Sequence, residues 1–145
     1  MEIIFTKLTD EEHSVEIRRL DNSVEKTILH TRTFLRHDLS HLAVEIEVPL
    51  TFGFWGSVAS GTPLTGAEIF GKEIGIAESL SGPVQTLMRV DAKVEQYSAI
   101  LEQVQPHLAS LDLAERIHER VRKLRGHWSA TSYGGEMIIE WPEND

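Results

Sequence analysis

The chain has 145 residues and no cysteine, so one domain (1–145) is expected, and disulfides and thiolate metal sites are excluded. Its 23 acidic and 14 basic residues give a formal net charge of −9, which opposes binding to nucleic acid and to anionic membranes. We see no run near the ~20 apolar residues of a membrane span and no secretory signal in MEIIFTKLTDEEH, so we expect a cytoplasmic protein without membrane partners.

Three short segments near the start of the chain predict β-strands, at residues 2–8, 14–20 and 24–30. In the second segment, Val15 and Ile17 alternate with charged residues, as in a strand that is buried on one face. The sequences TDEE and DNS supply turn residues between the segments. We therefore expect a meander of three antiparallel strands.

A helix is expected next, from about Thr33 to Ile46, because its apolar residues recur at helical spacing and Pro49 follows. The glycine- and aromatic-rich stretch TFGFWGSVASGTPLTG then predicts a tight turn or a short, closely packed helix. Its aromatic residues could line a ligand pocket over the preceding helix, but we expect them to be packing anchors.

The longest helical pattern begins at Pro83, which suits the first position of a helix, and is stopped by Pro106. Ser110 can cap a further helix that buries Leu113, Ile117 and other apolar residues at the same spacing. This last helix also carries a basic cluster. We expect its cations to complement the helix dipole rather than to bind nucleic acid; they are Arg116, Arg120, Arg122, Lys123 and Arg125.

The chain closes with a fourth predicted strand at 136–141, where Met137, Ile139 and Trp141 alternate with acidic residues and Pro142 follows. Strands at both ends with helices between them are typical of an α+β domain. We expect a small antiparallel sheet, made of the N-terminal meander and the C-terminal strand, packed against about four helices.

Chemistry is concentrated in FLRHDLSHLAVE, within the first predicted helix. A helical wheel places Leu35, Leu39, Leu42 and Ile46 on a core face, and Arg36, Ser40 and Glu47 on a solvent face. The titratable residues His37, Asp38, His41 and Glu45 fall on a third stripe, mixed with Phe34, Val44 and Val48.

Two histidines four residues apart can bind one metal ion, because they lie one helical turn apart. The carboxylate of Asp38 could activate a water molecule on that ion. Glu45 could bind the ion beside His41, or it could orient His41 from behind. The sequence therefore predicts a candidate zinc or other divalent metal site with His37, His41 and Glu45 as ligands and Asp38 as the catalytic group. A further ligand could come from His30, His107, His118 or His127.

The segment HDLSH resembles the zincin metalloprotease helix, in which two histidines bind zinc and the intervening acid is the base. That resemblance implies zinc on His37 and His41, with Asp38 standing where zincins have glutamate. The segment LRHDLSH also resembles the H-D dyad of HD-domain phosphohydrolases. That likeness implies His37 and Asp38 as metal ligands and an all-helical fold, in contrast to the strands expected in residues 1–30.

Across most of its length the chain is similar to a group of small bacterial proteins to which no activity is assigned. The likeness rests on HDLSHLAVE, GFWG, HWSAT, the paired glycines and the final WP. Two hypotheses follow from the sequence. The chain is a metal-dependent hydrolase or metal-binding protein acting on a small-molecule or peptide substrate, or it is a metal-free structural or interaction domain, homodimeric in one version.

Overall fold

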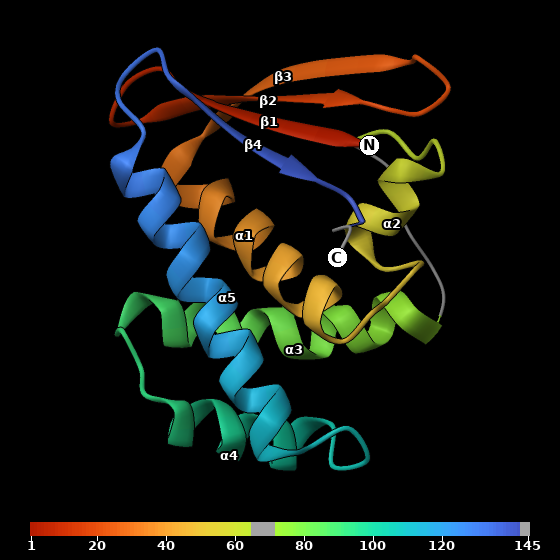
Figure 1. Ribbon diagram of the computed structural model, residues 1–145, viewed down its shortest axis with the longest axis vertical. Coiled ribbons are helices and arrows are strands. Elements are labelled where there is room, and N and C mark those ends of the chain that lie inside the picture. Colours follow the sequence, from red (N-terminus) through yellow and green to blue (C-terminus); the bar gives the residue numbers. More distant parts are fainter. Residues whose placement is uncertain (65–71, 143–145) are drawn as a thin grey trace.

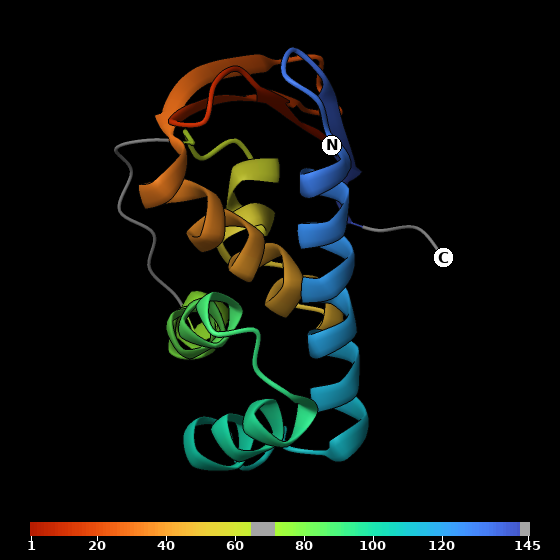
Figure 2. The same cartoon turned by 90° about the vertical axis from the view of Figure 1, so that its left-hand side faces the viewer.

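The computed structural model describes residues 1–64 and 72–142. In this part of the chain the elements are β1 (Glu2–Lys7), β2 (Glu12–Arg18), β3 (Val24–His30), α1 (Thr31–Glu47), α2 (Phe54–Ala59), α3 (Lys72–Arg89), α4 (Val94–Val104), α5 (Leu111–Ala130) and β4 (Glu136–Glu140). Figure 1 shows the strands as one layer with the helices gathered on one side of it, and Figure 2 shows α4 farthest from that layer. The α+β prediction is confirmed.

The four strands form one antiparallel sheet in the order β3-β2-β1-β4. The first three strands are the predicted meander, and β4 adds the C-terminal strand beside β1. Alternate residues such as Ile3, Phe5 and Val15 are fully buried against the helices, as strand periodicity predicts. The all-helical fold implied by the HD-domain resemblance is not the fold of the described residues.

The first and last strands are joined beyond the ladder itself. The amino group of Met1 donates a hydrogen bond to the carbonyl of Trp141 at 2.8 Å, and the Trp141 N–H donates to the carbonyl of Met1 at 2.8 Å. The sheet therefore fixes the N-terminal residue and the residue that follows β4 against each other.

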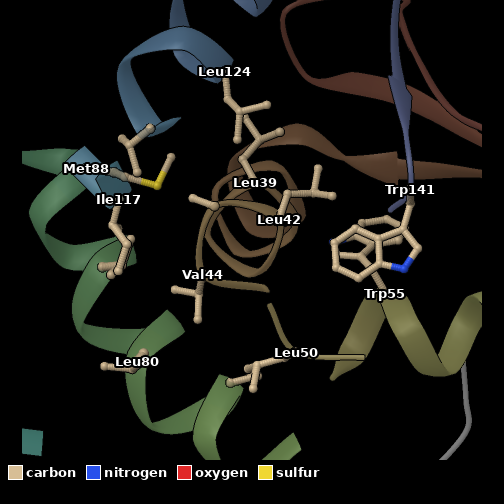
Figure 3. Packing of buried hydrophobic residues seen from close by; sticks show 14 of the residues in the cluster. Leu39, Leu42, Val44, Leu50, Trp55, Leu80, Met88, Ile117, Leu124 and Trp141 are labelled. Carbon is tan, nitrogen blue, oxygen red and sulfur yellow. The ribbon is translucent and has the colours of Figure 1, made fainter. Parts of the chain in front are cut away.

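Helix α1 is the central helix, because α2, α3 and α5 all pack against it. Figure 3 looks along α1, with Leu124 of α5, Leu80 of α3 and Trp55 of α2 arranged around it. Ser40, expected on a solvent face, is fully buried, and its hydroxyl donates to the carbonyl of His37 at 2.8 Å. That expectation is wrong because a helix packed by several neighbours keeps only a narrow exposed face.

The long helical pattern that begins at Pro83 belongs to two helices rather than one. Pro83 lies inside α3, not at a first helical position, and the chain breaks between Arg89 and Val94 with Asp91 at φ +49°. Helix α3 continues through the proline because buried residues on both sides of it share one face. These residues are Ile74, Ala77, Leu80 and Ser81 before Pro83, and Val84, Leu87 and Met88 after it.

The remaining helices agree with the sequence. The GFWG segment forms the short helix α2, in which Trp55 is fully buried. Helix α5 begins as predicted, because the Ser110 hydroxyl accepts a hydrogen bond from the Leu113 N–H at 3.0 Å. None of the described helices combines the length and the apolar character that crossing a bilayer would require.

Candidate metal centre

Helix α1 places His37, His41 and Glu45 one helical turn apart along the same side. The His37 and His41 rings lie with their centroids 4.6 Å apart. The side chains of His41 and Glu45 are fully buried, whereas the side chain of His37 is 38 % exposed. The stripe therefore runs from a solvent-accessible histidine into the interior of the protein.

Glu45 is the most heavily hydrogen-bonded residue of this stripe. Its carboxylate accepts from Nδ1 of His41 at 3.0 Å and from the backbone N–H groups of Phe54 and Trp55 at 2.9 Å each. Since a carboxylate only accepts hydrogen bonds, a neutral His41 must carry its proton on Nδ1. Nε2 of His41 then keeps the lone pair that a metal ion needs.

Helix α2 is built onto Glu45 at close range. A Cβ atom on Gly53 would lie 2.4 Å from Cδ of Glu45, and one on Gly56 would lie 1.8 Å from the carbonyl oxygen of Thr51. The two glycines therefore allow the backbone approach that the expected close packing requires. The Phe54 ring lies 5.3 Å from the His41 ring and 5.9 Å from the His37 ring, so it also forms one wall of the site.

Helix α3 brings a third candidate ligand, Glu78, to the two histidines. Its Oε1 lies 3.3 Å from Nε2 of His41, and ligand atoms of His37, His41 and Glu78 all lie within 4.8 Å of one another. The Glu78 side chain is 58 % exposed, so it can adjust its position. Glu45 is not a member of this group, because its oxygens accept hydrogen bonds from three N–H donors. Of the two roles that the sequence left open for Glu45, this arrangement favours the one in which it orients His41.

Sequence reasoning did not find Glu78, or Ser81 one turn further along α3. Both precede Pro83, where the predicted helix begins. The signal was present, because Glu78 and Ser81 directly follow Ala77 and Leu80, which recur at helical spacing. Extending the helix through the proline would have placed both polar residues beside its buried face.

Asp38 lies next to His37 with its carboxylate buried. Its Oδ1 is 3.0 Å from Nδ1 of His37, and this hydrogen bond raises the pKa of His37 above its usual value, with desolvation acting in the opposite sense. The carboxylate thus fixes the orientation of the His37 ring and leaves Nε2 for an ion. This placement favours a positioning role for Asp38, the residue expected to be catalytic.

The other histidines named as possible ligands lie in different surroundings. Nδ1 of His30 is 3.2 Å from the Thr33 hydroxyl, and His118 packs edge-on against Tyr97 with a centroid distance of 5.3 Å. His127 lines a hollow between α5 and β4, and His107 lies in the turn after α4. In the described part of the chain, the group of three suited to an ion contains Glu78 instead.

The distances suit a first-row divalent ion. Tetrahedral ligand atoms about 2.1 Å from an ion are separated by about 3.4 Å. The 3.3 Å between His41 and Glu78 matches that separation, and the ligand atom of His37 would need to move closer by at most about 1.4 Å from the 4.8 Å limit. Two imidazoles and one carboxylate are typical of zinc and of non-haem iron sites.

A hollow of about 480 Å³ lies between the end of α1, the α1–α2 connection, α2, α5 and the end of β4, and Glu45 lines it whereas His37 and His41 do not. Leu50, Ala59 and Trp141 form much of its wall, and Glu47 is paired there with Arg120 at 3.1 Å. Its two carboxylates, Glu45 and Glu47, already have hydrogen-bond or ion-pair partners and no histidine lines it, so the histidine site is the better candidate for a metal.

Comparison with known proteins leaves the geometry as the basis for assigning a function. No protein-family model matches the chain. No curated protein and no solved structure gives a significant match either. The likeness of HDLSH to zincins and to HD-domain phosphohydrolases therefore remains an expectation from the sequence.

Proposed function

We propose that this chain binds one divalent transition-metal ion through His37, His41 and Glu78. The observation that carries the proposal is the convergence of these ligand atoms from two helices within 4.8 Å, around a buried His41 whose other nitrogen is held by Glu45. A fixed tautomer and a buried carboxylate partner are the usual support of a metal-binding histidine.

Three protein ligands leave room for a water molecule or substrate on the ion, as in catalytic zinc sites. A metal-bound water can act as a nucleophile near neutral pH. The proposed use of the ion is hydrolysis of a small-molecule or peptide substrate. His37 and Glu78 are the exposed ligands, so substrate would approach the ion past these two side chains.

The first test is elemental analysis of protein purified without an affinity tag, followed by titration calorimetry with zinc, manganese and cobalt. We expect one ion per chain, and Glu78→Gln should weaken binding by about tenfold or more. The matched control is Glu102→Gln, at an exposed position on α4. A chain that binds none of these ions, or a Glu78→Gln protein as tight as the control, would contradict the proposal.

Asp38→Asn separates two roles for the acid beside His37. If Asp38 positions His37, as we propose from its 3.0 Å contact, the variant should lose metal affinity. If Asp38 is instead a general base, the variant should keep the metal and lose only hydrolytic activity. Calorimetry and an activity assay on the same preparation distinguish these outcomes.

A second arrangement at this site resembles that of a serine hydrolase, with Ser81 as nucleophile, His41 as base and Glu45 as the acid that orients the base. The Ser81 hydroxyl lies 3.2 Å from Nε2 of His41, whose Nδ1 faces Glu45. A serine nucleophile must meet its substrate, however, and Ser81 is only 2 % exposed, in the middle of α3. The burial of the hydroxyl favours the metal site over a serine hydrolase.

The alternative of an interaction domain, formed by two copies of the chain, has one feature in its favour. Val24, Ile28 and Ile138 are exposed on the face of the sheet turned away from the helices. They lie on the two edge strands, with Glu16 and Lys26 between them, so they do not form a continuous apolar patch. Sedimentation equilibrium would test this alternative, which requires a dimer.

A further inference from the structure

We infer that the hydroxyl of Ser81 is the fourth ligand of the ion, on its buried side. This inference rests on the proposed function and completes the ligand set as two nitrogens and two oxygens. The atom is already in place, because Oγ of Ser81 lies 3.2 Å from Nε2 of His41. That separation is close to the about 3.4 Å expected between two ligands of one tetrahedral ion.

Helix geometry supports the same assignment. Glu78 and Ser81 are three residues apart on α3, so they project from neighbouring positions on one face, as His37 and His41 do on α1. Nε2 of His41 lies at nearly equal distances from the two oxygens, 3.3 Å for Glu78 and 3.2 Å for Ser81. Each helix therefore supplies two candidate ligands, and the two oxygens from α3 both lie beside Nε2 of His41.

Burial provides a second, independent reason. Ser81 is 2 % exposed, and its hydroxyl contacts Nε2 of His41. Once that nitrogen binds an ion, the hydroxyl loses this acceptor, and a buried hydroxyl without a partner is unfavourable. Coordination to the ion restores a partner without moving the helix. With Ser81 as fourth ligand, water or substrate would bind from the solvent side as a fifth ligand, an expansion that catalytic zinc sites undergo.

The decisive experiment uses Ser81→Cys and cobalt(II). The chain has no cysteine of its own, so the new thiol would be the sole one present. A thiolate in the first coordination sphere produces an intense sulfur-to-cobalt charge-transfer band in the near ultraviolet. We expect that band in Ser81→Cys with one bound cobalt. Cobalt bound without the band would overturn the inference while leaving the metal site standing.

The matched control is Ser79→Cys, two residues away on another face of α3. Ser79 is half-buried, and its hydroxyl donates to the carbonyl of Ile76 at 2.8 Å. We expect no charge-transfer band from this variant. Failure of the unmodified chain to bind cobalt would overturn the proposed function itself, and this inference with it.

Ser81→Ala distinguishes a metal ligand from a serine with a merely structural role, because the two roles predict different changes in metal affinity. In the metal-free protein, the hydroxyl competes with an ion for Nε2 of His41, so removing a structural hydroxyl should leave metal affinity unchanged or raise it. Removing a ligand should instead lower affinity by about tenfold or more. Calorimetry with zinc distinguishes the two outcomes, and unchanged or tighter binding would overturn the inference.

Discussion

Glu45 shows how much one side chain can determine. Its buried carboxylate accepts from His41 and from two backbone N–H groups, whereas the amide introduced by Glu45→Gln would turn an NH₂ group toward at least one of these donors. A buried donor without an acceptor costs about 1–3 kcal/mol. We expect the free energy of unfolding, measured by urea denaturation, to fall by about 2 kcal/mol or more, and metal affinity to fall about 10–100-fold.

Glu47 is the matched control, two residues along the same helix. It pairs with Arg116 at 3.3 Å and with Arg120 at 3.1 Å, and its side chain is 13 % exposed. Hydrogen bonds to charged groups contribute about 1.5–3 kcal/mol, so Glu47→Gln should also lower stability. It should leave metal affinity unchanged, because the carboxylate of Glu47 is paired with arginines of α5. An equal loss of metal affinity in the two variants would contradict the role assigned to Glu45.

His13 predicts a pH dependence of stability. Burial lowers the pKa of His13 below the ordinary 6.5, and the nearby Asp38 offsets this only in part. Its ring lies against Phe5 and Trp128, and Nδ1 is 2.9 Å from the Thr31 hydroxyl. As pH falls, the imidazole of His13 therefore binds a proton in the unfolded chain before it does so in the folded protein. Stability is fully present above pH 6.5 and is lost as pH falls through the folded value.

His13→Leu should remove that loss. Between about pH 8 and about pH 5, the unmodified chain should lose stability relative to the variant by at most about 1.4 kcal/mol per pH unit. The raised pKa of His37 acts in the opposite sense, but it is common to both proteins and cancels in the difference. Urea denaturation across this range provides the measurement, and parallel curves would refute the prediction.

At the scale of elements, α2 is held by an unusually close approach. Gly53→Ala would place a Cβ atom 2.4 Å from Cδ of Glu45, whose position is fixed by three hydrogen bonds. Overpacking of this kind costs about 1–3 kcal/mol. Gly126→Ala, inside α5 where a Cβ meets nothing within 4 Å, should instead stabilise by about 0.5–1 kcal/mol. Thermal denaturation compares the two, and a shift of the same sign in both would count against the packing argument.

The elements differ in how well the sequence predicts them. Alternation places the strands within a residue or two because each has one buried face, as Val15 and Ile17 show. The predicted start of α3 is wrong because it follows the local rule for proline and leaves packing out. Pro83 suits a helix start in isolation, but buried residues before and after it keep the helix continuous.

The candidate site is predictable only in part, for a related reason. His37, His41 and Glu45 share one helix, so their mutual placement follows from helical spacing alone. Glu78 and Ser81 come from α3, and their approach depends on how two helices cross. The orienting role of Glu45 depends likewise on the position of the α2 backbone, which no periodicity of α1 encodes.

At the scale of the whole molecule, the charge distribution predicts no useful affinity for DNA or RNA. The net charge is −9, and cations of the basic cluster on α5 are paired: Arg116 with Asp112, Arg122 with Glu119 and Arg125 with Asp91. Paired cations contribute little to the release of counterions that drives such binding. Fluorescence anisotropy with an arbitrary duplex at physiological salt should show no sub-micromolar binding, and tight, salt-sensitive binding would contradict this expectation.

The pairing of β1 with β4 has a consequence for a chain made from one end to the other. A ribosome releases β1 long before its neighbour, so the sheet must wait for residue 136 and beyond. The candidate ligands all lie within residues 37–81, so none of them belongs to the part of the chain that is made last. During synthesis, an ion could therefore bind while the backbone groups on one edge of β1 still lack their β4 partners. In that interval β1 is an open template for any other strand it meets.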